Sequence, residues 1–339
     1  METGKLRAFM DLSRIHGSPI IIGFCLLGML SAAGTPSILD FLPIIIIGFI
    51  FKSAGSVHNE LVDLDADSRD PMLQKKPIQA GLISKREARI YMLCSLAAGA
   101  AMSILFFPPA VSGLLFLAVG VIFIYNAWGK YVPVLYELLF STSMTLLLLA
   151  GALLAGGPTR LTAVLALTVF TSSIFAQWLN GCRDLDCDKN AGVASIPSLQ
   201  ARCSGHDDIN VLTGVVIWVL YTFSLLLPFI FCVIRLVYLP LTLGIHAGTS
   251  ISLFRGLHRA ATRSMFNRLL VFQVVAYWFM VPIFLVEKAG WAASLGLSAF
   301  TILGTILAIA AEKATQYKLA FDPAGPSDPR NQAAGGVDG

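Results

Sequence analysis

Charged residues are scarce in this chain: they make up 13% of its 339 residues, against about 25% in ordinary soluble domains. Hydrophobic residues make up 56%. This composition excludes an ordinary soluble globular protein and indicates a polytopic membrane protein embedded in a lipid bilayer. The net charge is only +4, and the bases do not gather in one patch, so we expect no nucleic-acid partner.

Cysteine and histidine are also few, with six and five residues. The cysteines do not have the spacing of a disulfide framework. Cys182 and Cys187 flank an acidic segment, but no histidine follows at the spacing of a zinc site. The sequence therefore predicts neither a disulfide-stabilised fold nor a structural zinc centre.

Long apolar runs, in contrast, are abundant. A helix needs about 20 mainly apolar residues to cross a bilayer, and ten stretches are long enough. They cover residues 18–34, 40–58, 87–107, 110–127, 133–156, 161–181, 209–233, 235–254, 268–286 and 291–312. We therefore predict an all-α polytopic membrane protein.

The basic residues divide unequally between the two sides of this topology. Of the 24 lysines and arginines, Arg160, Arg235 and Lys288 fall on one side, and Lys52 lies within a span. The remaining 20 lie at the N-terminus or in loops that follow even-numbered spans. Because cytoplasmic loops are enriched in lysine and arginine, we predict that this second side is cytoplasmic.

Two acidic clusters stand out against this background, one after the second span and one after the sixth. A carboxylate at membrane depth is costly and is usually functional. Each cluster contains an asparagine and two aspartates at steps of four residues, which places them on one helical face. These residues are Asn59, Asp63 and Asp67, and Asn180, Asp184 and Asp188.

Two facing stripes of carboxylates suit hard divalent cations such as Mg²⁺, with a polyanion held between them. We predict that the polyanion is a diphosphate with a hydrophobic tail in the apolar bundle. Asp63, Asp67, Asp184 and Asp188 are then the catalytic metal-binding groups. The basic residues that could neutralise the leaving group are Arg14, Arg69, Lys76, Lys130, Arg183 and Lys189.

An ionised prenyl group is a carbocation, which aromatic faces stabilise and apolar walls shield from water. Many aromatic residues lie on the predicted spans or at their ends, although belts at the membrane interface and helix packing also favour that placement. The residues predicted to line the cavity are Tyr125, Phe175, Trp178 and Asn180.

At these clusters the chain resembles the UbiA superfamily of intramembrane prenyltransferases, over about residues 10–290. The family's motif Asn-Asp-x-x-Asp-x-x-x-Asp matches residues 59–67, and its basic-Pro pair followed by a glycine matches residues 76–81. Its motif Asp-x-x-x-Asp, often with a glycine four residues later, matches residues 184–192. Looser matches to the family are Tyr125, Lys130, Arg14 and Pro19.

The resemblance implies a bundle of nine to ten helices around a central cavity. It places Mg²⁺ and an isoprenyl diphosphate at the cytoplasmic mouth, with a lateral opening to lipid. Two residues depart from the pattern. Glu60 replaces the usual Asp but keeps its charge, so we expect it among the metal ligands. Lys76 stands where Arg is usual, which removes bidentate phosphate recognition.

The predicted spans and the composition between them divide the chain into three parts. Residues 1–17 are expected to form a cytoplasmic N-terminus, and residues 18–313 the catalytic domain. Loops 68–86 and 182–208 are expected to cap its cytoplasmic side. Residues 314–339, rich in Gly, Pro, Ala and Asp towards their end, are expected to be a disordered tail.

Three functions remain open. The first is Mg²⁺-dependent transfer of a prenyl group, of farnesyl or geranylgeranyl length, to a lipophilic acceptor such as an aromatic ring in isoprenoid or meroterpenoid biosynthesis. The second is class I terpene cyclisation, known from a smaller branch of the superfamily, in which the cation reacts with its own double bonds. The third is an ion-coupled carrier, which the position of the clusters at the membrane edge disfavours.

Overall fold

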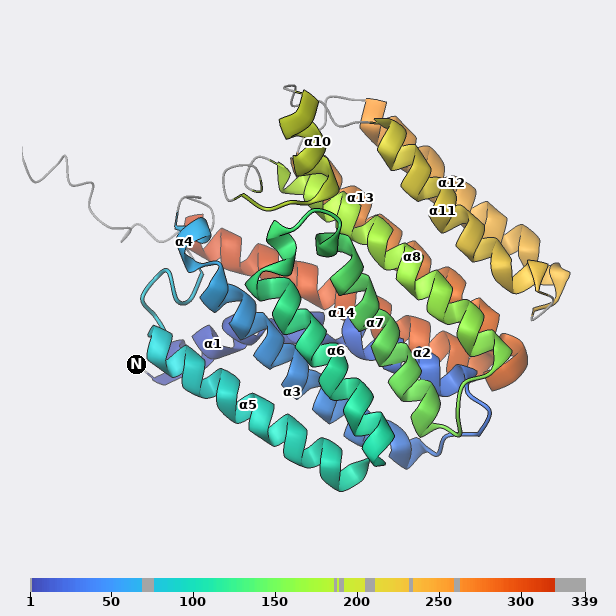
Figure 1. The fold of residues 1–339 in the computed structure, drawn as a ribbon, viewed down its shortest axis with the longest axis horizontal. Helices are drawn as coiled ribbons and strands as arrows, with labels where there is room; N and C mark the ends of the chain where they lie inside the picture. The colour runs from blue at the N-terminus through green and yellow to red at the C-terminus, as the bar shows by residue number, and fades with distance from the viewer. Residues whose placement is uncertain are drawn as a thin grey trace, which may run out of the picture.

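Helices make up the regular structure of this protein (Figure 1), and no strand occurs in the described part of the chain. The computed structural model describes residues 2–68, 76–185, 188, 192–204, 211–231, 234–258 and 263–320.

The first half of the chain folds into long helices joined by short ones. They are α1 (Glu2–Ser13), η1 (Ile15–Gly17), α2 (Ser18–Ser31), α3 (Ile38–Val62), α4 (Leu64–Asp67), α5 (Lys85–Phe106), α6 (Pro109–Ala127), η2 (Gly129–Tyr131) and α7 (Leu135–Leu154).

The second half continues in the same way. Its helices are α8 (Arg160–Arg183), α10 (Ile196–Ser204), α11 (Val211–Ile230), η3 (Leu236–Tyr238), α12 (Leu239–His258), α13 (Arg263–Met280), η4 (Val281–Leu285) and α14 (Val286–Ala320).

Each predicted span coincides with a helix, from α2 for the first to α14 for the tenth. Seven helical segments in the described residues are long and apolar enough to cross a membrane, and one of these joins α13 to α14 across residues 268–310. Within α14, Gly290 has a φ of 82°, so the tenth span begins where the helix direction changes. The fold is thus that of a polytopic all-α membrane protein.

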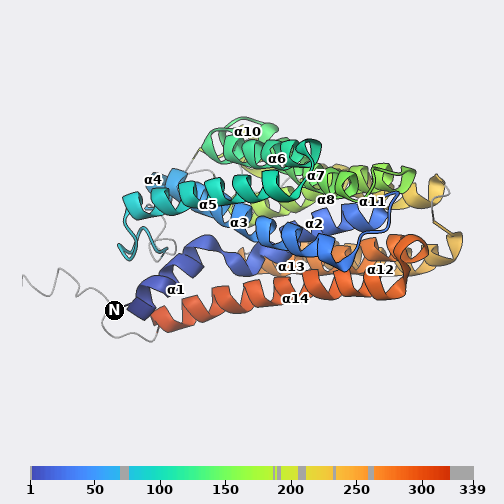
Figure 2. The same cartoon turned by 90° about the horizontal axis from the view of Figure 1, so that it is seen from below.

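The helices form a flattened bundle in two layers. In Figure 2, α5, α6, α7 and α8 lie in one layer, and α12, α13 and α14 lie in the other. The helices α4 and α10 and the C-terminal end of α14 lie along the same edge of the bundle (Figure 1). The two acidic clusters therefore lie at one edge, as the alternating topology requires.

Helices α2 and α7 approach each other so closely that their backbones touch. A Cβ atom added to Gly28 would lie 1.9 Å from the carbonyl oxygen of Leu148, and one added to Gly151 would lie 1.9 Å from that of Cys25. Such close contact through small residues is typical of helix packing in membranes, where van der Waals contact replaces water exclusion as the driving force.

The sequence did not predict helix α1, which packs across the C-terminal part of α3 and the start of α5. Ala8 and Leu12 are buried in a small apolar cluster that also contains Val57, Leu64, Ile78, Ile83 and Ala88. Ser13 Oγ and Tyr91 Oη lie 3.0 Å apart, and Tyr91 Oη lies 2.8 Å from Ser53 Oγ. The N-terminal segment thus contacts the loop that follows the first acidic cluster.

The C-terminal helix is longer than expected. We expected the ordered domain to end at residue 313, but α14 continues to Ala320. No glycine or proline interrupts the chain between Gly304 and Pro323, so nothing in the sequence ends the helix earlier. The rest of the expected tail, residues 321–339, lies outside the described residues.

Candidate functional site

The centre of the site is an ion pair between Asp63 and Lys130. Asp63 caps the C-terminus of α3, where its N–H donates to the carbonyl of Asn59 (3.0 Å). The Lys130 ammonium, in η2 between α6 and α7, donates to the Asp63 carboxylate, and Lys130 as a whole is 5% exposed. A buried lysine needs such a partner, so the pair fixes the end of α3 against the α6–α7 turn.

The other members of the first cluster point in different directions. Asp65 is exposed, as expected for a residue on the other helical face. Asp67 ends α4, but its side chain lies outside the described set, as does all of Arg69. Glu60 is buried, and its Oε1 accepts a hydrogen bond from the N–H of Ile78 at 3.4 Å.

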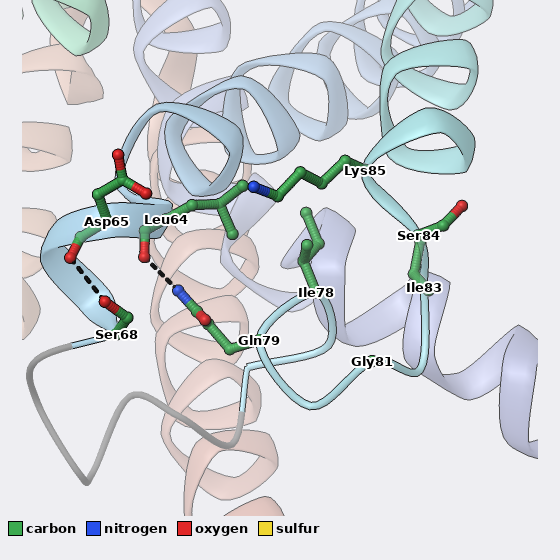
Figure 3. Close-up of a pocket in the computed structure, with 9 residues that line it drawn as sticks. All are labelled: Leu64, Asp65, Ser68, Ile78, Gln79, Gly81, Ile83, Ser84 and Lys85. Atoms are coloured by element: carbon green, nitrogen blue, oxygen red, sulfur yellow. Dashed lines mark hydrogen bonds between the residues drawn. The ribbon is translucent and has the colours of Figure 1, made fainter.

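A surface pocket of about 410 Å³ lies between α4, the loop at residues 76–84 and the start of α5 (Figure 3). Asp65 lines it, together with Gln79, whose side-chain amide donates to the carbonyl of Leu64. Asp63 and Lys130 do not line it. The pocket is therefore distinct from the predicted diphosphate site, and it marks the outer side of the first cluster.

The second cluster follows α8. Arg183 donates from Nε to Oδ1 of Asp184 (3.0 Å) and from Nη2 to Oδ2 (2.5 Å). Asp188 accepts a hydrogen bond from Ser195 Oγ at 2.9 Å. The pKa of Asp188 is raised to about 7, mainly because the carboxyl is buried. The Ser195 hydrogen bond and the charges of Arg183 and Lys130 lower this pKa, and the Asp184 carboxylate raises it. Lys189 and Asp186 lie outside the described residues.

A short segment, residues 193–196, joins the two clusters, and we call it the strap. The N–H of Ala194 donates to the carbonyl of Lys130 (2.7 Å), and the N–H of Ile196 donates to Glu137 Oε1 (2.8 Å). Ser195 binds Asp188, as described above. Because Lys130 also binds Asp63, a continuous set of contacts runs from the first cluster to the second.

Sequence reasoning missed Glu137 and Ser195. Glu137 lies in the first turn of α7 and is 1% exposed, and no described side chain or main-chain group donates to its Oε2. The sequence signal for Glu137 was an acidic residue at the start of an apolar span, because burying an acid in a membrane protein is costly and usually reflects a function. Ser195 offered no comparable signal.

The predicted cavity residues divide into two groups. The ring of Tyr125 lies 5.5 Å from that of Tyr136 and 5.9 Å from that of Phe140, at the end of α6 beside the Asp63–Lys130 pair. Phe175 and Trp178 are buried where α8 packs on α11, and a Cβ atom on Gly214 would lie 2.5 Å from the Trp178 ring. These two residues pack helices together, whereas Asn180 is half-buried next to the second cluster.

Two further predicted basic residues lie within the described part of the chain. Arg14, between α1 and α2, is exposed and has a left-handed backbone, with φ 47° and ψ 43°. Lys76 is half-buried at the start of the ordered 76–84 loop. Lys76 thus belongs to the loop that follows the first cluster. Arg14 lies further from that cluster, because the neighbouring Ser13 contacts Tyr91, which contacts Ser53 of α3.

The oxygen donors at this edge fit Mg²⁺. In the described residues no three side chains of His, Cys, Asp or Glu converge into one group. Mg²⁺ does not require such a cage, because it commonly takes one or two carboxylates and completes its coordination with water and substrate phosphates. Asp63, Asp184 and Asp188 offer carboxylate oxygens of this kind.

Comparison with known sequences gives a family. The family model described as the UbiA prenyltransferase family matches residues 21–272. The digeranylgeranylglyceryl phosphate synthase of Korarchaeum cryptofilum is 30% identical over 197 residues, which is 57% of this chain and 67% of that protein. The 4-hydroxybenzoate octaprenyltransferase of Vibrio atlanticus is 30% identical over 135 residues, covering 39% of this chain and 47% of that protein.

Solved structures give the same fold. A digeranylgeranylglyceryl phosphate synthase structure superposes with a TM-score of 0.63 at 20% identity, covering 86% of this chain and all of that one (100%). The UbiA homologue of Archaeoglobus fulgidus bound to DMAPP and Mg²⁺ gives 0.59 at 17% identity, covering 81% and 99%. The fold, the apolar spans and the matched family model agree, and this integral multi-pass membrane protein belongs to the UbiA prenyltransferase family.

Proposed function

We propose that this protein is a Mg²⁺-dependent intramembrane enzyme that ionises an isoprenyl diphosphate and transfers the prenyl group to a lipophilic acceptor. The observation that carries the proposal is the Asp63–Lys130 pair joined through the strap to Asp188. This arrangement places acids of both motifs and a buried cation at one edge of an apolar bundle.

In this proposal Mg²⁺, when bound, neutralises the diphosphate and so makes it a better leaving group. Asp63, Asp184 and Asp188 hold the cation with Asn59 and Asp67. Lys130 and Arg183 add fixed positive charge where the departing diphosphate becomes more negative. Lys76, in the loop after the first cluster, assists in this role, and Arg14, Arg69 and Lys189 remain predictions from the sequence.

The apolar bundle then separates the prenyl cation from water. Tyr125 is the aromatic residue best placed to face the reacting carbon, because it lies in the last turn of α6, near the ion pair. We assign the donor to the farnesyl or geranylgeranyl class. The relatives named above act as transferases, which supports an acceptor over cyclisation.

The test is turnover in membranes that contain the full-length protein. We expect no net consumption of farnesyl or geranylgeranyl diphosphate with Mg²⁺ alone, and consumption when an aromatic or polyol-phosphate lipid acceptor is added. A cyclic hydrocarbon formed without acceptor would show a cyclase, and diphosphate left intact under every condition would favour the carrier. Asp63→Asn is the control for turnover that does not depend on the site.

We further propose that the site opens to the cytoplasm. A reporter fused after Lys313 should lie on the same side of the membrane as one inserted within residues 70–85, and that side should be cytoplasmic. Reporters on opposite sides would mean nine crossings. One segment after residue 208 would then not cross.

A further inference from the structure

Two buried glutamates lie beside the acidic clusters. Glu60 on α3 and Glu137 at the start of α7 are each 1% exposed. A buried carboxylate is costly unless hydrogen bonds or a cation stabilise it. The carboxylate of each glutamate accepts a hydrogen bond from a main-chain N–H: Glu60 from Ile78 in the loop after the first cluster, and Glu137 from Ile196 in the segment after the second.

Glu60 contacts the loop after the first cluster. Its Oε1 accepts from the N–H of Ile78, whose side chain is buried in the apolar cluster formed with α1. The loop is compact: the N–H of Ala80 donates to the carbonyl of Lys76 (2.8 Å), and that of Leu82 donates to Pro77 (3.0 Å). The hydrogen bond between Glu60 and Ile78 therefore holds this turn against α3. The turn begins at the basic residue Lys76.

Glu137 contacts the strap after the second cluster. Its Oε1 accepts from Ile196, the first residue of α10, at 2.8 Å. Negative charge at a helix N-terminus is favourable, so the contact stabilises the start of α10 as well. On the same strap, Ala194 binds the Lys130 carbonyl and Ser195 binds Asp188.

We propose that Glu60 and Glu137 are positioning residues that hold the loops after the two acidic clusters in their binding geometry. Each fixes one main-chain N–H, so that Lys76 on one loop and the Lys130–Asp188 link on the other are in place before a diphosphate arrives. For Glu60 this role replaces the metal ligation that we expected from the family resemblance. The consequence for catalysis rests on the function proposed above.

Four variants separate anchoring from metal binding. Glu60→Gln and Glu137→Gln keep a side-chain oxygen that can accept the N–H, but lose the negative charge by which a carboxylate strengthens metal binding. Glu60→Met and Glu137→Met keep the length and lose the acceptor. The control is Glu287→Gln, because Glu287 pairs with Arg235 (3.5 Å) at the other end of the bundle.

The first measurement is amide hydrogen exchange of the full-length protein in lipid, without substrate. Each Met variant should speed exchange at least tenfold in its own loop, residues 76–84 for Glu60 and 192–204 for Glu137, and leave the other loop unchanged. The Gln variants and the control should stay within threefold of the wild type. Unchanged exchange in a Met variant would overturn the proposal for that residue.

The second measurement is the steady-state rate as a function of prenyl diphosphate and of Mg²⁺. The Met variants should raise KM for the diphosphate about tenfold with kcat within threefold, and the Gln variants should keep the wild-type Mg²⁺ half-saturation. A rise in Mg²⁺ half-saturation in Glu60→Gln or Glu137→Gln as large as in Asp63→Asn would show a metal ligand and overturn the proposal.

Two outcomes need a second route. If a Met variant does not fold, Glu60→Asp and Glu137→Asp keep the charge but shorten the reach by one methylene, and they should show the same local increase in exchange. If the wild type turns over no prenyl diphosphate, the exchange results still decide the anchoring role. In that case the proposed function alone would fail.

Discussion

The two acidic clusters have the same spacing but neutralise their charge differently. In the first, Asp63 pairs with Lys130, a buried residue 67 positions away in the sequence. In the second, Asp184 pairs with its own neighbour Arg183, whose side chain is 28% exposed. The first cluster thus depends on the tertiary fold for its counter-charge, whereas the second carries its own and depends on the strap for its position.

This difference distinguishes residues that contribute their charge to the site from residues that hold other parts of the site in position. Removing Lys130 takes away both a buried charge and the link between α3 and the strap. Removing Arg183 takes away a charge that solvent partly screens. The following predictions test how far the two clusters differ, from the largest expected effect to the smallest.

The largest effect should come from the aspartates themselves. We expect that alanine at any of the four lowers kcat about 100-fold or more, about 2.7 kcal/mol in transition-state stabilisation, while the protein still inserts and folds. Single-turnover rates in membranes with matched protein levels measure this. Near-normal rates for both Asp184→Ala and Asp188→Ala would show that the second cluster is not needed for turnover. The four residues are Asp63, Asp67, Asp184 and Asp188.

The next effect should separate the two basic partners. Lys130→Met keeps most of the side-chain length and removes the charge, so we expect kcat to fall about tenfold, on the order of 1.4 kcal/mol. Arg183→Met should cost about threefold, because its charge is more exposed. Product analysis with donors of different length should show no change in tail preference. Equal losses at both positions, or a shift in tail preference, would remove the contrast.

A smaller effect should arise where α8 touches the strap. A Cβ atom on Gly181 would lie 2.9 Å from Ser195 Oγ and 3.1 Å from Pro197 Cδ. Overpacking of this kind costs about 1–3 kcal/mol when the neighbours cannot move. We expect Gly181→Ala to raise KM for the diphosphate about threefold with little change at the first cluster. Gly113→Ala on α6, where a Cβ meets no atom within 4 Å, is the matched control.

The smallest effect should be that of Asp65→Ala. Asp65 is exposed and lines the outer pocket instead of facing Lys130. We expect kcat and the Mg²⁺ half-saturation to stay within about twofold of the wild type, as for most exposed charges outside the site. A loss comparable to that of Asp63→Ala would mean that the outer face of α4 also binds the metal or the substrate.

The transmembrane part of the fold could be predicted because bilayer thickness imposes it on the sequence. Each span is a long apolar run, and Gly290, which separates the last two, marks the kink in α14. Helix α1 was missed because only part of it is apolar: Leu12 is buried while Lys5 pairs with Glu87. Its stability comes from packing on α3 and α5, which no local pattern records.

The site shows the same limit. Spacing predicted one helical face for Asn59, Asp63 and Asp67, but α3 ends at Val62 and Asp63 caps it, so one helix does not run through the cluster. The spacing also could not predict that Lys130 pairs with Asp63, because that contact joins the end of α3 to the turn between α6 and α7. Nor could it show that Glu137 accepts a main-chain N–H from the strap, since such contacts depend on tertiary geometry and not on residue type. The metal and diphosphate roles of the site residues remain predictions.

The backbone contact between α2 and α7 has a consequence for how substitutions will be tolerated. At Gly28 and Gly151 even one methyl group would meet a carbonyl oxygen of the facing helix. In a saturation library, both positions should keep glycine under selection for abundance alone, whether or not turnover is required. Asp184, whose partner Arg183 is partly exposed, should vary more freely under abundance selection and become fixed only when survival depends on product. Comparing the two selections would therefore sort residues that build the scaffold from residues that act on substrate.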